Sequence, residues 1–353
     1  MSLFNRNHKS VLSIDISTVA VKLLEMSKTG NRYRIESFTS IPFIQSTSTE
    51  TIAVNVNVIA EAIKLALTRS QSKLKQATVA VSGSAVITKI FTMPASLTEE
   101  DIESQIMIEA DQYVPYSLDE LNFDFEVQGV NSNNHEMVDV LFVASRRENV
   151  DERVEALAKA GLKASIVDVE TFAMENAFSL LPEYSDHPLD IQTVAVADIG
   201  ATLSSLTIFH MGRVVYTREQ EFGGRQLTEE IQHRYGLSFE EAEFKKIQGG
   251  LPENYQMDIL EPFKRAMVQQ IQRSLQFFIS SNTNKEINCL VLAGGCASIK
   301  SVDKLIEHNL SVPVYIANPL INLSLSNKIK PETLYNIAPA LMITCGLALR
   351  SFD

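Results

Sequence analysis

The sequence is poor in cysteine and in basic residues. Its three cysteines, Cys289, Cys296 and Cys345, stand singly without a CxxC pair, a pattern that indicates buried free thiols in a reducing compartment. The net charge is −12, from 31 basic and 43 acidic residues. With no long Lys/Arg run, this balance disfavours electrostatic binding of the whole surface to nucleic acid or anionic lipid.

Long apolar runs are also missing. The most apolar stretch, APALMITCGLAL, has about 12 residues, fewer than the roughly 18–20 that a membrane span needs. The start, MSLFNRNHKS, is polar and basic with no apolar segment behind it, so no signal peptide is expected. We therefore expect a cytoplasmic protein.

The composition is that of a folded globular chain. The 353 residues are 45% hydrophobic and 21% charged, which is ordinary for a globular protein. This length exceeds what one small core needs, so we expect two lobes or several subdomains.

Strand and helix patterns alternate along the first half. A strand–turn–strand over 11–28, a further strand at 33–41, an amphipathic helix at 58–70 and a strand at 77–83 predict a sheet with covering helices. The next region, 85–164, differs in style. A helix begins near Thr98, two strands flank the sequence NSNNHE, and a helix ends at Gly161, so we expect a small inserted α/β module.

The chain then repeats its opening pattern. VLSIDIST, with Asp15, corresponds to VAVADIGA, with Asp198: each is an apolar strand, an aspartate and a turn of small residues before another apolar strand. A duplication half a chain apart predicts two related lobes. The two aspartates are then expected to face each other across one cleft.

Each repeated turn has a plain and a functional interpretation. Aspartate favours turns by itself, so either copy alone can be an ordinary hairpin turn. A turn of small residues can also bring backbone N–H groups close to an anion, and the aspartate suits a hydrated Mg²⁺ on the same phosphates. Because both copies occupy matching positions, the pair favours phosphate and magnesium binding.

Two later segments belong to the same hypothesis. Strand, Gly294-Gly295, a small-residue loop and a helix follow in order over 289–310, an arrangement that can bind phosphate or pack on a nucleoside, although neither GxxxxGK[ST] nor GxGxxG is present. The charged segment 222–250 is strongly helical, and for most of its charges a solvated helix pair is sufficient explanation.

With these parts in this order, the sequence resembles the actin-like ATPase superfamily and, within it, the PilM family of type IV pilus assembly proteins. The resemblance covers essentially the whole chain. Its phosphate motifs match Asp15–Lys22 and Asp198–Thr202, its adenosine motif matches Leu292–Ser298, and AEFKKIQGG resembles the segment whose Glu and Lys reach the nucleoside. It implies ATP with Mg²⁺ between the lobes, with Asp15 and Asp198 holding the metal through waters. The implied nucleotide-binding residues are Asp15, Ser17, Thr18, Lys22, Asp198, Gly200, Ala201, Thr202, Gly223, Gly224, Glu243, Lys246, Gly294, Gly295 and Ser298.

The resemblance also implies the architecture: an α/β actin-like ATPase fold of two RNase H-like lobes, with a small α/β subdomain inserted in the first lobe. The expected boundaries are 1–84 for subdomain 1A (completed by 165–190 and 336–353), 85–164 for the inserted subdomain 1C, 191–225 for subdomain 2A (completed by 287–335) and 226–286 for subdomain 2B.

The implied function is that of a cytoplasmic adaptor in pilus assembly and twitching motility. Such an adaptor binds the N-terminal tail of the inner-membrane protein PilN in a groove beside the inserted subdomain. It thereby links a platform that includes PilO and PilP to the assembly motors, and it reaches the inner membrane through PilN.

Two departures from the superfamily pattern affect this expectation. Ser17 stands where the first turn usually has glycine, which alters phosphate contact. No FtsA-like amphipathic helix follows the last apolar segment, so membrane recruitment is assigned to a partner. No catalytic base stands out, and we expect ATP binding with weak or no hydrolysis.

Two other functions use the same fold. A small-metabolite kinase needs an acid beside its acceptor hydroxyl and a polar substrate pocket, whereas an FtsA-like division protein forms ATP-dependent filaments. Stimulated nucleotide turnover would identify the first, and sedimenting polymers the second.

Overall fold

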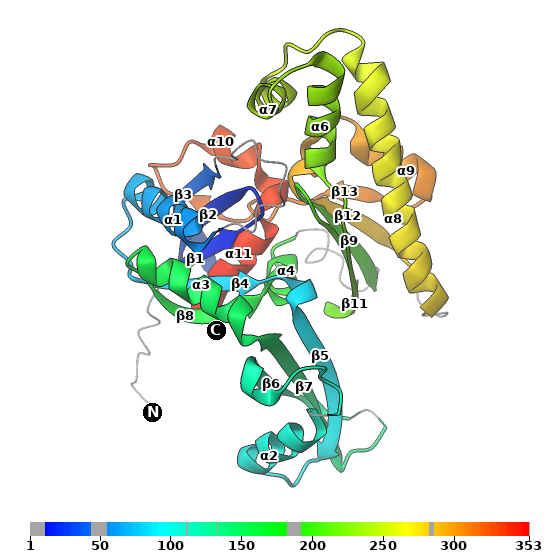
Figure 1. The fold of residues 1–353 in the computed structure, drawn as a ribbon. Helices are drawn as coiled ribbons and strands as arrows, with labels where there is room; N and C mark the ends of the chain where they lie inside the picture. The colour runs from blue at the N-terminus through cyan, green and yellow to red at the C-terminus, as the bar shows by residue number, and fades with distance from the viewer. Residues whose placement is uncertain are drawn as a thin grey trace.

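The computed structural model describes residues 11–43, 55–110, 112–131, 133–181, 192–281 and 286–352. The basic first ten residues and residues 182–190 of the expected subdomain 1A lie outside this part of the chain. Three sheets organise the fold (Figure 1). No helix among these residues is long and apolar enough to cross a membrane.

The first sheet has the strand order β14-β3-β2-β1-β4-β8. Every residue of its central strand β1 is buried, because helices cover both faces: Ile59 and Ile63 of α1 pack on one, and Leu341 and Cys345 near the C-terminus on the other. The bounds are β1 Leu12–Ile16, β2 Ala20–Thr29, β3 Arg32–Pro42, α1 Val56–Ser70, β4 Gln76–Val81, α3 Arg147–Lys159, β8 Lys163–Val169, β14 Ser324–Leu325, α10 Pro331–Tyr335 and α11 Met342–Leu349.

The second sheet has the order β11-β10-β9-β12-β13 and repeats the first. In each, an antiparallel three-strand meander is followed by a strand parallel to its first member: β4 beside β1, and β12 beside β9. The two related lobes predicted from the duplicated turns are confirmed. The bounds are β9 Thr193–Ile199, β10 Ser204–His210, β11 Arg213–Gln220, α6 Gly224–Tyr235, α7 Phe239–Gln248, α8 Glu261–Ser281, β12 Cys289–Ala293, α9 Val302–Leu310 and β13 Val314–Ile316.

The third sheet, β5-β7-β6, belongs to the inserted module. It is formed by β5 (Val86–Pro94), β6 (Leu121–Val130) and β7 (Met137–Arg146), with α2 (Glu99–Ala110) on one face. Phe91, Ile106 and Phe142 belong to its own core. The predicted hairpin is confirmed, since β6 and β7 pair in antiparallel fashion. We call residues 86–146 the 1C module.

Two segments lie elsewhere than the expected boundaries place them. Helix α3, expected inside the inserted subdomain, packs on the first sheet, where Ala156 and Leu157 join the core around Ile63. Strand β14, expected within the second lobe, pairs with β3 of the first sheet. The reason is apolar packing: Leu320 and Leu323, both just before the strand, are buried in the core of the first lobe.

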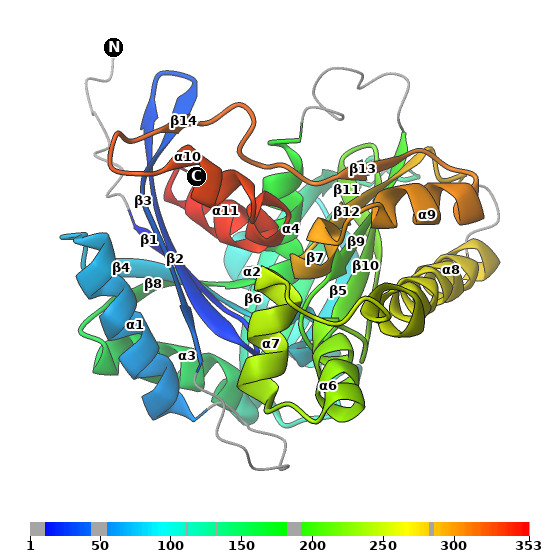
Figure 2. The same cartoon turned by 90° about the horizontal axis from the view of Figure 1, so that it is seen from above.

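Helices α4 (Glu170–Phe178) and α11 lie side by side between the two sheets (Figure 2). Met174 and Phe178 pack with β9 and β12 of the second sheet, whereas Ala173 packs with Ala80 of the first. A Cβ at Gly346 of α11 would lie 1.7 Å from the carbonyl oxygen of Ala173, so only glycine permits this close crossing.

Candidate functional site

Asp15 is the buried carboxylate of the first turn, with 4% of its surface exposed. Its Oδ2 accepts hydrogen bonds from Lys22 Nζ at 2.9 Å and from Thr344 Oγ1 at 2.8 Å. Lys22 lies directly opposite Asp15 in the β1–β2 register and also donates to the carbonyl oxygen of Ala340. The local hairpin therefore brings the balancing charge that a buried carboxylate requires.

Ser17 shapes the first turn itself. Its hydroxyl accepts hydrogen bonds from the backbone N–H groups of Val19 (3.3 Å) and Ala20 (3.1 Å) and donates to the Ala20 carbonyl. Serine in place of glycine thus closes the turn on itself. Two amides that could otherwise face an anion are engaged by this hydroxyl.

The second turn follows Asp198 at the end of β9. Gly200 N–H donates to the Leu203 carbonyl at 3.0 Å, and a Cβ at Gly200 would lie 2.9 Å from that oxygen. Thr202 Oγ1 donates to Thr18 Oγ1 at 2.9 Å. The first and second turns, half a chain apart in sequence, therefore touch across the two lobes.

The glycine pair Gly223-Gly224 is packed on the second turn. Gly224 N–H donates to the Gly200 carbonyl at 3.0 Å, and Arg225 N–H donates to the Ala201 carbonyl at 2.8 Å. A Cβ at Gly223 would lie 2.4 Å from the Ala201 oxygen. The start of α6 is thereby fixed against the second turn.

The third turn also reaches the second. Gly294 has φ +83°, and a Cβ there would lie 2.4 Å from Asp198 Oδ1; Cys296 Sγ donates to the Gly200 carbonyl at 3.5 Å. A Cβ at Gly295 meets no atom within 4 Å. The predicted order of strand, glycine pair, small-residue loop and helix is confirmed: β12 ends at Ala293, a 3₁₀ turn covers Gly295–Ser298, and α9 begins at Val302.

Ser298 lies at the outer end of this turn. It is exposed, and its hydroxyl donates to the Asn336 carbonyl at 3.5 Å. Among the residues that the structure describes, its side chain makes no hydrogen bond to another predicted site residue, so its place in the site stays a prediction.

Glu243 and Lys246 of α7 meet α6. Lys246 Nζ donates to Glu243 Oε2 at 2.6 Å, to Thr228 Oγ1 at 2.7 Å and to the Gly224 carbonyl at 3.3 Å. The two residues are thus brought to the glycine pair beside the second turn. Their predicted role toward a nucleoside fits this position and remains a prediction.

Asp15, Asp198 and Lys22 share one electrostatic environment. Burial raises the pKa of Asp198 to about 6, with Lys22 opposing and Asp15 adding to the rise. Burial alone lowers the pKa of Lys22, but the attraction of Asp15, with a further contribution from Asp198, outweighs it and the pKa is raised. The two repeated aspartates therefore act on the same lysine, as the predicted shared cleft requires.

Glu170, the first residue of α4, is a member of this group that the sequence reasoning missed. Burial raises its pKa to about 8, with repulsion from Asp15, Glu219 and Asp198 adding to the rise. A signal was available, because Glu170 directly follows the parallel strand β8, and such strand ends point toward sites. Only the tertiary arrangement shows that it lies near both aspartates.

Two carboxylates close to one lysine suit a hydrated cation better than a fully ligated one, because Mg²⁺ keeps several waters and takes one or two carboxylates. Among the residues that the structure describes, no cluster of three or more Cys, His, Asp or Glu side chains suits a metal ion. The predicted binding of Mg²⁺ through waters fits this donor set.

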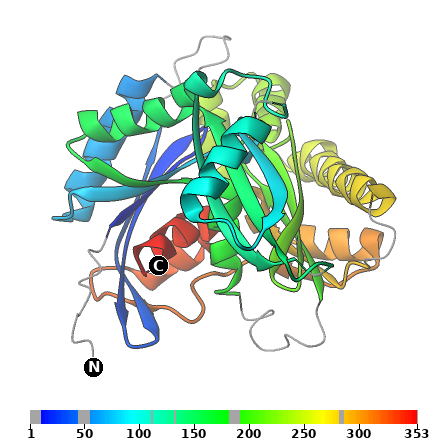
Figure 3. The ribbon, with the colours of Figure 1, turned by 90° about the horizontal axis from the view of Figure 1, so that it is seen from below.

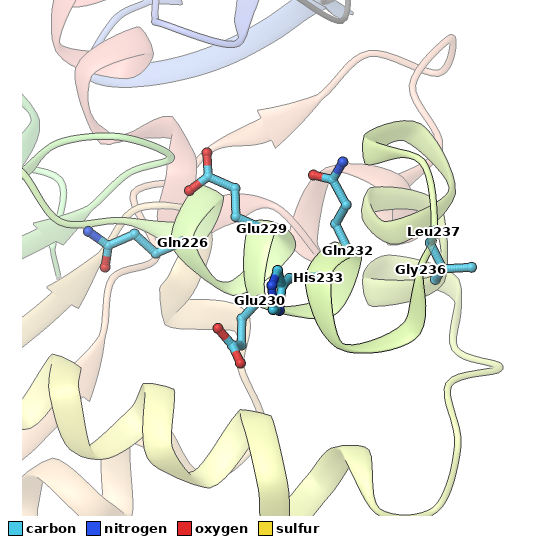
Figure 4. A pocket seen from close by; sticks show the side chains of 7 residues that line it. All are labelled: Gln226, Glu229, Glu230, Gln232, His233, Gly236 and Leu237. Carbon is cyan, nitrogen blue, oxygen red and sulfur yellow. The ribbon is translucent and has the colours of Figure 1, made fainter. Parts of the chain in front are cut away.

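A polar hollow of about 770 Å³ lies along α6, next to the turns rather than on them. Glu229 and Gln232 extend to one side of the helix and Glu230 to the other (Figure 4). None of the predicted site residues lines it; the lining residues are Gln226, Glu229, Glu230, Gln232, His233, Gly236 and Leu237.

Two duplicated sheets whose hairpin turns meet between the lobes define an actin-like ATPase fold. Solved structures agree: the chain matches ethanolamine utilization protein EutJ from Carboxydothermus hydrogenoformans with a TM-score of 0.54 and 15% identity, over 96% of this chain and 89% of that chain. A model of the family described as "Type IV pilus assembly protein PilM" matches residues 13–352. The chain belongs to this PilM family.

A second structure is much more similar. The chain matches the structure described as "PilM-PilN type IV pilus biogenesis complex" with a TM-score of 0.80 and 27% identity, over 98% of this chain and 99% of that chain. The predicted family and fold are thus confirmed.

Proposed function

We propose that this chain is a nucleotide-binding adaptor of the type IV pilus assembly machinery that binds the N-terminal tail of PilN. The observation that carries the proposal is the likeness, over nearly the full length of both chains, to the structure of a PilM–PilN complex. Family membership over residues 13–352 supports the same assignment.

The partner groove is assigned to the surface of the 1C module. Large apolar side chains there are exposed rather than packed: Ile90 at 59%, Ile108 at 71% and Tyr113 at 53%. Exposed apolar side chains of this size can take part in interaction surfaces. Ile108 lies on α2, whereas Ile90, next to the buried Phe91, lies on the opposite face of the sheet. An extended peptide of an inner-membrane protein is the occupant that the proposed function requires.

The nucleotide is assigned to the meeting point of the turns. Thr18 and the Gly200–Thr202 turn would hold phosphates, Asp15 and Asp198 the Mg²⁺ through waters, and Gly294-Gly295 with Glu243 and Lys246 the nucleoside. The open space beside Gly295 and the close packing of the other glycines fit such a ligand. Bound Mg·ATP supplies a charged group that both lobes contact at once, which favours the closed arrangement.

Hydrolysis is assigned a minor role. A group that activates water must lie within hydrogen-bonding reach of it and accept its proton, and no residue of the chain is assigned that role. ATP then acts chiefly as a ligand that stabilises one arrangement of the lobes. Through PilN, the adaptor would lie at the inner membrane and connect indirectly to PilO, PilP and the assembly motors.

Isothermal titration tests the partner assignment. The purified chain is titrated with a synthetic peptide of the PilN N-terminal tail from the same organism, and with a scrambled peptide of the same composition. Saturable heat with the native peptide alone is expected. Absence of heat at high micromolar peptide, with the chain folded by circular dichroism, would remove the assignment.

A further inference from the structure

The 1C module is joined to the first lobe through two neighbouring strand connections. One runs from the end of β4 through Ser82–Ala85 into β5, and the other from the end of β7 into α3. Ser145 Oγ donates to the Ala85 carbonyl at 2.8 Å and ties the two connections together. A paired connection of this kind forms a hinge about which a module with its own core can turn.

Strand β11 of the second lobe contacts the module at its start and the hinge near its end. At its start, Arg213 Nη1 donates to Gln128 Oε1 on β6 at 3.1 Å. Near its end, Glu219 lies over the hinge: its Oε2 accepts from Ser82 Oγ at 3.5 Å, and a Cβ at Gly83 would lie 2.9 Å from its Oε1. Seen from below, the module lies in front of the junction of the lobes (Figure 3).

The charges around Arg213 also favour its contact with the module. Burial raises the pKa of Glu175 on α4, Arg213 opposes that rise and Glu126 on β6 adds to it. Arg213 therefore acts on Glu175, on the helix between the lobes, where Glu126 of the module also acts with the opposite sign. Without it, the two like charges would repel each other across this contact.

Strand β11 is also connected to the candidate site through the hydrogen-bond ladders of the second sheet. In the register of the second sheet, Asp198 of β9 pairs with Ser205 of β10, and Ser205 pairs with Glu219 of β11. Directly opposed residues point to the same face of a sheet. Glu219 is thus two strands from Asp198 in one row, and continuous ladders join the second turn to the strand that contacts the module.

We propose that β11 transmits lobe closure to the 1C module, through Glu219 at the hinge and Arg213 on β6, so that nucleotide binding reorients the partner-binding unit. This inference rests on the proposed function, because it needs a nucleotide between the lobes and a partner on the module. Strand β11 is then the route by which nucleotide binding between the lobes controls partner binding on the module. The strand moves with the second sheet, while the hinge is held by the first lobe.

Electron–electron distance measurements test the proposal. Nitroxide labels are placed at Glu103→Cys on α2 and Asn309→Cys on α9, both exposed positions; Cys289, Cys296 and Cys345 are buried, so labelling goes to the introduced thiols. The probe is Mg²⁺ with a non-hydrolysable ATP analogue. We expect the analogue to shift the distance in the otherwise unchanged chain and the shift to be at least halved in the Arg213→Ala, Glu219→Ala double variant.

Two further variants make the result specific. Thr217→Ala, an exposed change on the same strand, should keep the full shift. Gly83→Ala places a Cβ 2.7 Å from Thr171 Oγ1 and 2.9 Å from Glu219 Oε1. It therefore displaces the Glu219 side chain at the hinge without removing it, should reduce the shift, and serves as a second test should the double variant misfold. A full shift in both the double variant and Gly83→Ala would overturn the proposal.

The same samples separate this inference from the proposed function. If calorimetry detects no binding of the analogue to the unchanged chain, the nucleotide assignment fails and the inference fails with it. If the analogue binds but the label distance does not move, the inference alone fails.

Discussion

At the scale of single residues, the site is a set of charges that compensate one another. Asp15 is buried at the centre of a sheet. The hairpin register places Lys22 opposite it, and their ion pair offsets the cost of burying the carboxylate. Within the described part of the chain, no side chain forms an ion pair with Asp198, and burial raises its pKa to about 6. An incoming cation would therefore gain most from Asp198.

Asp198→Ala should weaken Mg·ATP binding by about 1.5–3 kcal/mol, the range for a hydrogen bond to a charged group. The loss corresponds to roughly 10- to 100-fold in Kd and is measurable by calorimetry. Asp119→Ala, an exposed change in the 1C module, serves as the control and should bind normally. Equal affinity in both variants would mean that the second turn is only a turn.

Ser17→Ala should strengthen Mg·ATP binding, because it releases the Val19 and Ala20 amides from the serine hydroxyl. One or two hydrogen bonds of about 0.5–1.5 kcal/mol each correspond to a Kd lower by roughly 2- to 100-fold. Ser40→Ala, on the exposed side of β3, is the matched control. Weaker binding in Ser17→Ala would show that the closed turn is the binding conformation.

Glu170→Gln should change the pH dependence of stability. The folded chain raises the pKa of Glu170 from 4.5 to about 8, so between these values the folded state holds a proton that the unfolded state has released. Stability is therefore lost as the pH rises through this window. Glutamine removes that loss, so Tm should rise relative to the parent at pH 8 but not at pH 4.5. The exposed variant Glu152→Gln should show no such trend in thermal melts.

At the scale of elements, local pattern predicted what local geometry decides. The strand–aspartate–turn–strand units became hairpins because alternation and small turn residues specify them. Contacts that depend on distant packing were not predictable: α3 returns to the first lobe, β14 joins β3, and Glu170 approaches the aspartates only through the fold. Glycine at 294 was predictable as a turn, but not that its φ of +83° places it against Asp198.

Two glycines should respond in opposite ways to substitution. A side chain at Gly346 would strike the Ala173 carbonyl of α4, so Gly346→Ala should destabilise the fold by about 1–3 kcal/mol or more. Gly295→Val projects into open space, so it should leave Tm unchanged while blocking the nucleoside face. Thermal melts and ATP titration on both variants check this, and unchanged ATP binding in Gly295→Val would count against the third turn.

At the scale of the whole molecule, the lobes meet at Thr18 and Thr202 and along α4 and α11. A ligand that contacts both lobes should therefore stabilise them together. At about 100 times its Kd, Mg·ATP should add about 2.7 kcal/mol to the free energy of unfolding, seen as one cooperative upward shift in calorimetry. Two separated transitions, with only one shifted, would show that the nucleotide is held by a single lobe.

The 1C module keeps its hydrophobic core to itself and leaves the first lobe through adjacent chain crossings. Substitutions on the surface of the module can consequently change which partner it binds without altering the residues where the two lobes meet. Gln128 and the Ser82–Gly83 segment are the exceptions. There, any replacement module would still have to fit strand β11 of the second lobe, which contacts both.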